Sequence, residues 1–143
     1  DGAAGLGKEA ISTIEASDEL LIVTNPEMPA ITDALKAVKL AEKIGIPIIG
    51  AILTRVKLDG LDMTITNVEE MLEIPVLGVI PEDTAVRKAM VSKNTIIDCY
   101  PKSSSSIAYK KLAAKLLGED YQEDINQKKA KTIIDAILSI FRK

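Results

Sequence analysis

Polar residues that could take part in chemistry gather in three short stretches, each directly after an apolar run. These stretches are Thr24-Asn25-Pro26-Glu27, Thr54-Arg55 and Pro81-Glu82-Asp83. Their hydroxyl, amide, guanidinium and carboxylate groups can orient a ligand through hydrogen bonds and charge. The chain contains no histidine, which removes the usual general base and the commonest zinc ligand. The stretches therefore favour positioning and charge stabilisation over a histidine-activated nucleophile.

The apolar runs that precede these stretches are predicted to be strands. They cover residues 20–24, 48–54 and 76–80. They lack the alternation of apolar and polar residues that is typical of a strand with one solvent-exposed face. The pattern predicts an α/β fold, with a parallel sheet flanked by helices. Because the carboxyl ends of parallel strands meet at one edge, we expect the three polar stretches to converge there and to form a ligand site.

Helices are predicted between these strands. One begins near Pro29, runs to about Lys43 and is ended by Gly45, with Pro47 just beyond. Residues 56–63 are predicted to form a loop. A short helix is predicted over residues 66–72, with Thr66 and Glu69 at the spacing of a capping box. Another covers residues 84–91, with Asp83 as its N-cap.

The flanking segments give weaker signals. Residues 1–7 contain three glycines and lead into a helix with small or apolar residues at positions 10, 11 and 14. Residues 95–98 are predicted to form a short strand. The four serines at 103–106 precede an apolar helical pattern that ends at Gly118, and one of them is expected to be the N-cap of that helix.

Composition is typical of a compact cytosolic domain. The 143 residues are 47% hydrophobic and 27% charged, and their net charge of −3 argues against a general nucleic-acid binder. Cys99 is the only cysteine, so no disulfide within the chain and no cysteine pair for a metal is available. No apolar run approaches the roughly 20 residues that cross a bilayer, and we expect no signal peptide. The chain begins at Asp1 rather than Met, and we expect it to be a fragment.

Several motifs resemble those of the MinD/ParA group of P-loop ATPases, and of MinD-type proteins in particular. Residues 1–6, Asp-Gly-Ala-Ala-Gly-Leu, resemble the family's D-x-P-A-G-[LI] segment, with Ala3 in place of the usual proline. Thr24-Asn25-Pro26-Glu27 with Asp33 resembles T-N-P-E…D, and residues 78–83 resemble G-V-I-P-E-D. The resemblance implies the C-terminal half of such a protein: a partial P-loop NTPase fold of the SIMIBI type over residues 1–118, followed by a separate tail.

The resemblance also implies roles for individual residues in the parent ATPase. Asp1 would lie near Mg²⁺ through water and orient the attacking water, and Gly5 would offer its N–H to the γ-phosphate of ATP. The adenine pocket would be formed by Thr54, Arg55, Pro81, Glu82 and Asp83. The family's N-terminal phosphate loop has no counterpart in these residues. We therefore expect the parent to be an ATPase and this chain alone to be inactive.

Partners are implied as well. Asn25, Glu27 and Asp33 would lie at the interface of an ATP-dependent homodimer, and a division-regulator protein would be a further partner. A purely structural role remains an alternative for three of the charged residues named so far. Asp83 could serve only as an N-cap, Asp33 only as a first-turn acid that complements the helix dipole, and Arg55 only as a solvated charge.

The tail, residues 119–143, is predicted to be a linker and a basic amphipathic helix. Residues 128–143 carry a net charge of +4 and the other residues −7. One arc of the helical wheel gathers the apolar residues, among them Ile133, Ile134, Ile137, Leu138 and Phe141. Such a helix suits adsorption to an anionic membrane, which would place the protein in the cytoplasm at the inner face of the cell membrane. Docking of this apolar arc on the core or on a partner is the alternative.

The function that these observations favour is an ATP-dependent, dimerising membrane switch of the MinD type, which positions cell division (septum site) or related machinery. A ParA-like partition ATPase is one alternative, and it would need a basic DNA-binding surface. An iron–sulfur carrier would need bridging cysteines, which Cys99 cannot supply alone. A non-enzymatic α/β interaction module is the alternative from another class.

Overall fold

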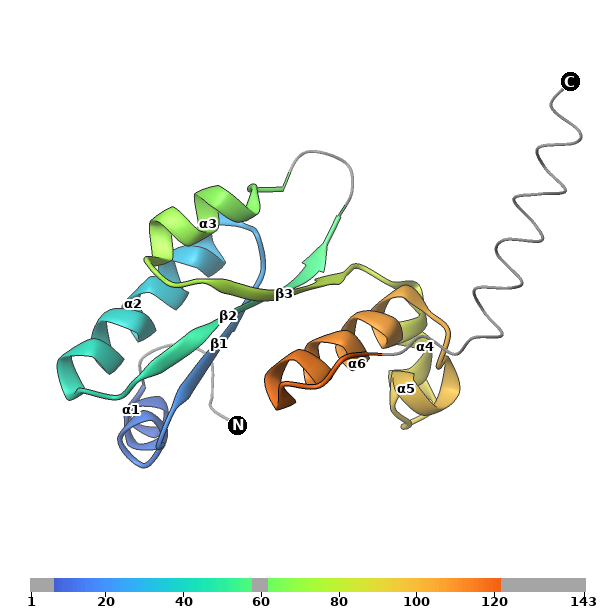
Figure 1. Ribbon diagram of the computed structural model, residues 1–143, viewed down its shortest axis with the longest axis horizontal. Coiled ribbons are helices and arrows are strands. Elements are labelled where there is room, and N and C mark those ends of the chain that lie inside the picture. Colours follow the sequence, from blue (N-terminus) through green and yellow to red (C-terminus); the bar gives the residue numbers. More distant parts are fainter. Residues whose placement is uncertain (1–6, 58–61, 122–143) are drawn as a thin grey trace, which may run out of the picture. The chain divides into compact units, whose positions relative to one another are not determined.

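The fold is a parallel three-stranded sheet flanked by helices, as predicted (Figure 1). The computed structural model describes residues 7–57 and 62–121. The strands, in the spatial order β1-β2-β3, are β1 (Leu20–Thr24), β2 (Ile48–Val56) and β3 (Val76–Pro81). The helices are α1 (Lys8–Glu15), α2 (Met28–Ile44), α3 (Ile65–Leu72), α4 (Thr84–Val91), α5 (Ile96–Cys99) and α6 (Ser104–Leu117).

The helices α2 and α3 cover one face of the sheet. Their fully buried residues Ile31, Val38, Val68 and Leu72 pack in one cluster with residues of β1 and β2, including Leu53. Burial of a side chain of this size contributes on the order of 1.5–3 kcal/mol. This cluster therefore fixes the two connections that bring the strands side by side in parallel.

The first part of α6 packs on the opposite face. Leu112 forms a second cluster with Ile52 of β2 and Ile80 of β3. Gly78 permits this contact, because a Cβ at that position would lie 2.8 Å from Leu112 Cδ1. The chain divides into two units, residues 1–112 and 113–143, so α6 crosses their boundary. The domain boundary that we expect after Gly118 stays a prediction.

Several predicted elements are confirmed at their ends. β1 and α4 begin and end at the predicted residues. Gly45 ends α2 in the left-handed conformation, with φ +88°, and its N–H donates to the carbonyls of Ala41 and Glu42. Ser103 is the expected serine cap of α6, since its hydroxyl accepts a hydrogen bond from the N–H of Ser106.

Three local predictions are wrong. The N-cap of α3 is Thr64, which accepts from the N–H of Asn67, and Glu69 instead accepts from the N–H of Val76 at the start of β3. Residues 95–98 do not form a strand. Thr95 caps the short helix α5 through the N–H of Asp98, a capping-box spacing that outweighs the apolar pair between them. β2 also continues through residues 55 and 56, which we expected to lie beyond it.

Candidate functional site

The carboxyl ends of β1 and β2 are joined by side-chain hydrogen bonds. Thr54 Oγ1 lies 3.0 Å from Asn25 Oδ1 and 3.3 Å from the carbonyl oxygen of Thr24. Parallel pairing of Thr24 with Leu53 places Thr54 beside the end of β1. The predicted convergence of polar residues at this edge of the sheet is therefore confirmed for these two stretches.

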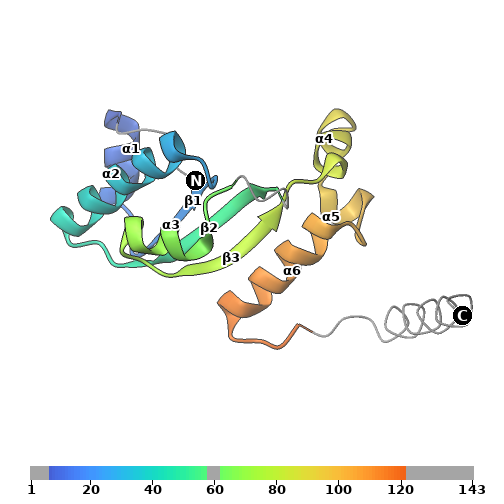
Figure 2. The same ribbon diagram turned by 90° about the horizontal axis from the view of Figure 1, so that it is seen from above.

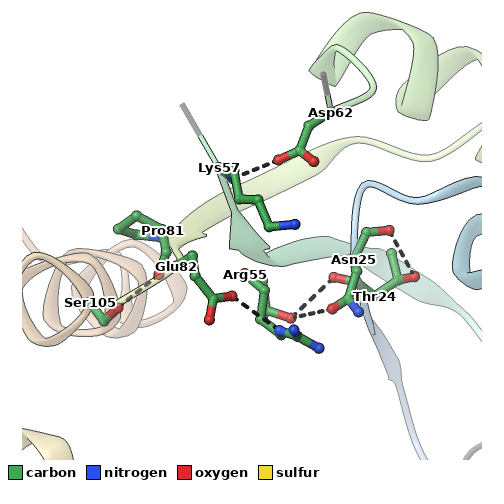
Figure 3. A network of polar contacts seen from close by, with 9 residues as sticks. Thr24, Asn25, Arg55, Lys57, Asp62, Pro81, Glu82 and Ser105 are labelled. Carbon is green, nitrogen blue, oxygen red and sulfur yellow. Dashed lines mark hydrogen bonds and ion pairs between the residues drawn. The ribbon is translucent and has the colours of Figure 1, made fainter. Parts of the chain in front are cut away.

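Arg55 has an unusual backbone conformation for a residue in a strand. Its φ is +57°, and the register between β2 and β3 shifts between Leu53 and Val56. An irregularity of this kind redirects a side chain, and positive φ is costly for a residue other than glycine. Arg55 Nε donates to Glu82 Oε2 at 3.1 Å, so the third polar stretch also meets the second (Figure 3).

Pro81 and Glu82 are held to their neighbours through the main chain. The N–H of Glu82 donates to the carbonyl of Val56 at 2.9 Å, which continues the contact between β2 and β3. The carbonyl of Pro81 accepts a 2.9 Å hydrogen bond from the hydroxyl of buried Ser105. The loop after β3 is thus fixed between β2 and the first turn of α6.

Asp83 caps two helices at once. Its Oδ1 accepts from the N–H of Ala85 in α4, and its Oδ2 accepts from the hydroxyl of Ser104 and the N–H of Ser105 in α6. The hydrogen bond from Ala85, with those from the serines, lowers the pKa of Asp83 below its ordinary value of 3.8. The expected N-cap is confirmed, whereas a role of Asp83 in binding a nucleotide stays a prediction.

The residues expected at a dimer interface lie on the connection from β1 into α2. Asn25 follows β1, and Glu27 occupies the N-cap position of α2 without a capping hydrogen bond from its side chain. Asp33 lies on α2, where its carboxylate pairs with Lys36 at 2.8 Å. Of these three residues, Asn25 is the one that the described contacts join to the strand ends.

Two groups of predicted site residues lie outside the described part of the chain. They are the catalytic and metal-side pair, Asp1 and Gly5, and the membrane group of Ile133, Ile134, Ile137, Leu138 and Phe141. Their roles stay predictions. Among the described residues, no helix is long and apolar enough to cross a membrane.

Sequence reasoning missed the contribution of α6 to this edge. Ser104 and Ser105 bind the loop after β3, although their serine-rich segment resembles a linker. The burial of Ser105 is set by the packing of α6, which a local pattern does not show. The sequence does contain a signal for the pairing of Arg55 with Glu82, because these oppositely charged residues lie one and two positions after the apolar runs of neighbouring strands.

The side chains assembled at this edge are of the types that orient a ligand through hydrogen bonds and charge. Thr54, Asn25 and Arg55 place a hydroxyl, a carboxamide and a guanidinium at one edge, and Glu82 adds a carboxylate. These groups match the alternating hydrogen-bond donors and acceptors of a nucleobase. Strand ends of an open α/β sheet are also the usual position of a nucleotide.

Comparisons with known proteins identify the family and the fold of this chain. The family of "4Fe-4S iron sulfur cluster binding proteins, NifH/frxC family" matches residues 8–141. An uncharacterized ATP-binding protein of Methanocaldococcus jannaschii is 39% identical over 99% of this chain and 53% of its own length. The septum site-determining protein MinD of Bacillus subtilis is 29% identical over 99% of the chain and 54% of its own length. The chain thus spans about half the length of these relatives.

Solved structures show the same fold. The cell division ATPase MinD of Pyrococcus furiosus gives a TM-score of 0.76 at 34% identity, over 82% of this chain and 50% of that one. The septum site-determining protein MinD of Pyrococcus horikoshii, complexed with Mg-ADP, gives 0.75 at 32% identity, over 81% and 48%. A MinC:MinD cell division protein complex of Aquifex aeolicus gives 0.75 at 25% identity, over 84% and 50%.

The iron–sulfur cluster in the description of the matching family does not fit this chain. A [4Fe–4S] cluster is held by four cysteine thiolates. Cys99, the single cysteine of the sequence, is exposed on α5, so even two copies would supply only two thiolates. The described residues also contain no cluster of metal-binding side chains. Within these 143 residues the family match therefore concerns the fold, because a single cysteine does not hold a [4Fe–4S] cluster.

Proposed function

This chain belongs to the NifH/frxC family of P-loop ATPases with MinD-type relatives, and from that membership we propose that it is part of an ATP-dependent switch. In this proposal the parent protein binds and hydrolyses ATP, and the nucleotide state controls the assembly of machinery for septum placement. The names of the relatives support this function, and the three solved structures named above are MinD proteins or contain one.

The observation that carries the proposal is the contact between three strand ends around Thr54 and Arg55. Thr54 bonds the end of β1, and Arg55 bonds the loop after β3 from a strained backbone position. Strain of this kind concentrates at binding sites, where it fixes the direction of a side chain. We assign the adenine side of the nucleotide site to this edge, formed by residues 54, 55 and 81–83.

The phosphate side of the site would use other residues. Asp1 would orient water around Mg²⁺, and the N–H of Gly5 would contact the γ-phosphate. Mg²⁺ bound with ATP would neutralise charge on the phosphates. The sequence contains no lysine-rich phosphate loop of the G-K-[ST] type. Because that loop supplies most phosphate contacts in such enzymes, we propose that these 143 residues alone neither bind ATP tightly nor hydrolyse it.

The remaining parts of the proposal concern assembly. ATP would bring two copies together through the region of Asn25, Glu27 and Asp33. The tail helix, with Ile133 to Phe141, would then hold the dimer at the inner face of the membrane by avidity. The MinC:MinD complex supports a division regulator as a further partner.

The base-binding assignment is tested by nucleotide selectivity in the protein that includes a phosphate loop. Titration with fluorescent ATP and GTP analogues would compare the parent with Thr54→Val, Arg55→Ala and the control Lys57→Ala. Loss of a base contact weakens ATP binding by roughly threefold to tenfold per side chain. We expect this loss at Thr54 and Arg55, with GTP binding changed less.

Equal loss of ATP and GTP binding would contradict the assignment, because it would indicate a general defect of the fold or of phosphate binding. Lys57 is a suitable control, since it is an exposed cation two residues from Arg55 and its main-chain N–H, not its side chain, bonds Asp62. The 143-residue chain by itself should show no saturable binding of either analogue.

A further inference from the structure

Residues 84–112, from the start of α4 to the buried Leu112, are strongly basic. They contain six basic residues and one acidic residue, for a net charge of +5, whereas residues 1–83 contain six basic and fifteen acidic residues, for a net charge of −9. The basic residues of this region are Arg87, Lys88, Lys93, Lys102, Lys110 and Lys111. Charge separated in this way creates a local positive potential although the whole chain is acidic.

The same region exposes large apolar side chains. Met90 and Val91, at the end of α4, are 71% and 87% exposed, and Ile97 on the neighbouring α5 is 40% exposed. Ala89, by contrast, is only 2% exposed and fixes the rotation of α4. The side of α4 that carries Met90 and Val91 therefore faces solvent. Figure 2 shows α4 and α5 next to each other and beyond the end of the sheet.

Helix geometry places cations beside these apolar residues. Arg87 and Lys88 precede Val91 by four and three positions, which puts all three on one face of α4. The N–H of Lys93 donates to the carbonyl of Met90 at 3.0 Å, and Lys93 has a φ of +55°. The turn after α4 is thus held against the end of the helix, with Lys93 close to Met90.

We propose that this α4 surface, formed by Arg87, Lys88, Met90, Val91, Lys93 and Ile97, contacts an anionic membrane. Lysine and arginine can keep their charges at lipid phosphates while neighbouring apolar side chains enter the interface. Nucleic acid would satisfy the cations but would leave Met90 and Val91 without an apolar partner. The proposal goes beyond the proposed function, which assigns membrane contact to the tail, and it rests on residues of the body alone.

The first test measures contact at the surface itself, in the full chain. An environment-sensitive dye is attached at Val91→Cys in a Cys99→Ser background, and the protein is mixed with vesicles of phosphatidylcholine containing phosphatidylglycerol. We expect a blue shift and brighter emission with anionic vesicles and no change with pure phosphatidylcholine. The matched control carries the dye at Ile65→Cys, because Ile65 is also exposed, at 47%, but lies on α3. Equal shifts at both positions, or none at position 91, would overturn the proposal.

The second test separates the α4 surface from the tail by co-sedimentation. Lys88→Gln and Lys93→Gln are each expected to weaken binding to anionic vesicles about fivefold, from the roughly 1 kcal/mol that a cation contributes near such a surface. The control Lys43→Gln removes a cation from α2 and should change binding little. Met90→Gln with Val91→Gln should weaken vesicle binding without affecting retention on duplex DNA.

Three results would count against the surface. One is loss of DNA retention in the lysine variants with unchanged vesicle binding, which would indicate a nucleic-acid surface. Another is unchanged vesicle binding in both the apolar and the lysine variants. The third is complete loss of the dye signal at position 91 in the tail variant Ile137→Asp, combined with normal binding of the α4 variants. That result would show that the tail, and not the α4 surface, contacts the membrane. The proposed membrane contact of the tail helix would then still stand.

Discussion

Arg55 Nε lies 3.1 Å from Glu82 Oε2, and this ion pair links the ends of β2 and β3. Its side chains are 65% and 39% exposed, and exposed pairs contribute at most about 1 kcal/mol. The φ of +57° at Arg55 costs about 1–2 kcal/mol for a residue with a Cβ. The pair therefore does not offset the backbone conformation that presents it, which is what we expect where a side chain serves binding rather than stability.

Glycine at position 55 should separate stability from function. Arg55→Gly relieves the positive φ, so we expect the melting temperature to stay equal or to rise by about 1–3 °C. Binding of ATP by the protein with a phosphate loop should nevertheless fall. Glu73→Gly is the matched control, because Glu73 also has a positive φ, of +56°. It lies at the end of α3, before the start of β3, and not at the carboxyl ends of the strands. This variant should raise the melting temperature without loss of ATP binding, even though it removes the ion pair with Lys39. Lower melting temperatures for both variants would show that neither residue is strained.

The two caps made by Asp83 predict a pH dependence of stability. Its folded-state pKa is lowered by the hydrogen bonds from Ala85 and the serines, so its contribution is fully present above the ordinary value of 3.8 and is lost as the pH falls through the lower folded-state pKa. Asp83→Asn keeps the shape but leaves one carbonyl oxygen for three donors. At pH 7 we expect a loss of about 1 kcal/mol in the free energy of unfolding.

Urea denaturation at a series of pH values would check this expectation. The difference in the free energy of unfolding between the unmutated chain and Asp83→Asn should be constant near neutrality. It should shrink below pH 4, because the carboxylate of Asp83 in the unmutated chain then becomes protonated. A difference that grew in acid would contradict the assignment. Asp98→Asn is a useful comparison, since Asp98 caps nothing beyond the one-turn helix α5 that contains it.

Gly50 allows two strands to approach closely. Its φ is +149°, and a Cβ there would lie 2.7 Å from the carbonyl oxygen of Pro75 and 2.6 Å from Leu77 Cγ. Gly50→Ala therefore combines backbone strain with a contact to main chain that cannot move alone, and we expect a loss of about 2 kcal/mol or more in the free energy of unfolding. Gly78→Ala should cost less, because its Cβ would meet the flexible end of Leu112. Chemical denaturation of both variants gives the comparison, and an equal cost would argue against main-chain strain at Gly50.

Sequence reasoning was most reliable where one local pattern decides the outcome. The unbroken apolar run of β1, the N-cap at Asp83 and the terminal Gly45 each depend on a few adjacent residues, and all three are confirmed. At residues 64–66 two threonines compete for one cap, and the structure uses Thr64, whereas the sequence pattern predicts Thr66. The site was predicted as a meeting of strand ends, because parallel strands align their carboxyl ends.

What the sequence could not supply are features created by packing. The positive φ of Arg55 arises where the register between β2 and β3 shifts. An arginine does not indicate such a conformation, because glycine is the residue that usually adopts it. The exposure of Val91 depends on which side of α4 buries Ala89. The burial of Ser105 depends on α6 lying against the loop after β3.

Ser105 offers a test of how α6 holds that loop. Its hydroxyl donates to the carbonyl of Pro81 at 2.9 Å, its N–H donates to Asp83, and the residue is fully buried. Ser105→Ala leaves the Pro81 carbonyl without this donor, so we expect a loss of about 1–2 kcal/mol in the free energy of unfolding. Ser104→Ala removes one exposed hydrogen bond to Asp83 and should cost less.

The double variant Ser105→Ala with Asp83→Asn should lose less free energy of unfolding than the two single variants together, because Ser105 and Asp83 hold the same turn. Strict additivity would show that the hydroxyl of Ser105 and the carboxylate of Asp83 stabilise this turn independently of each other.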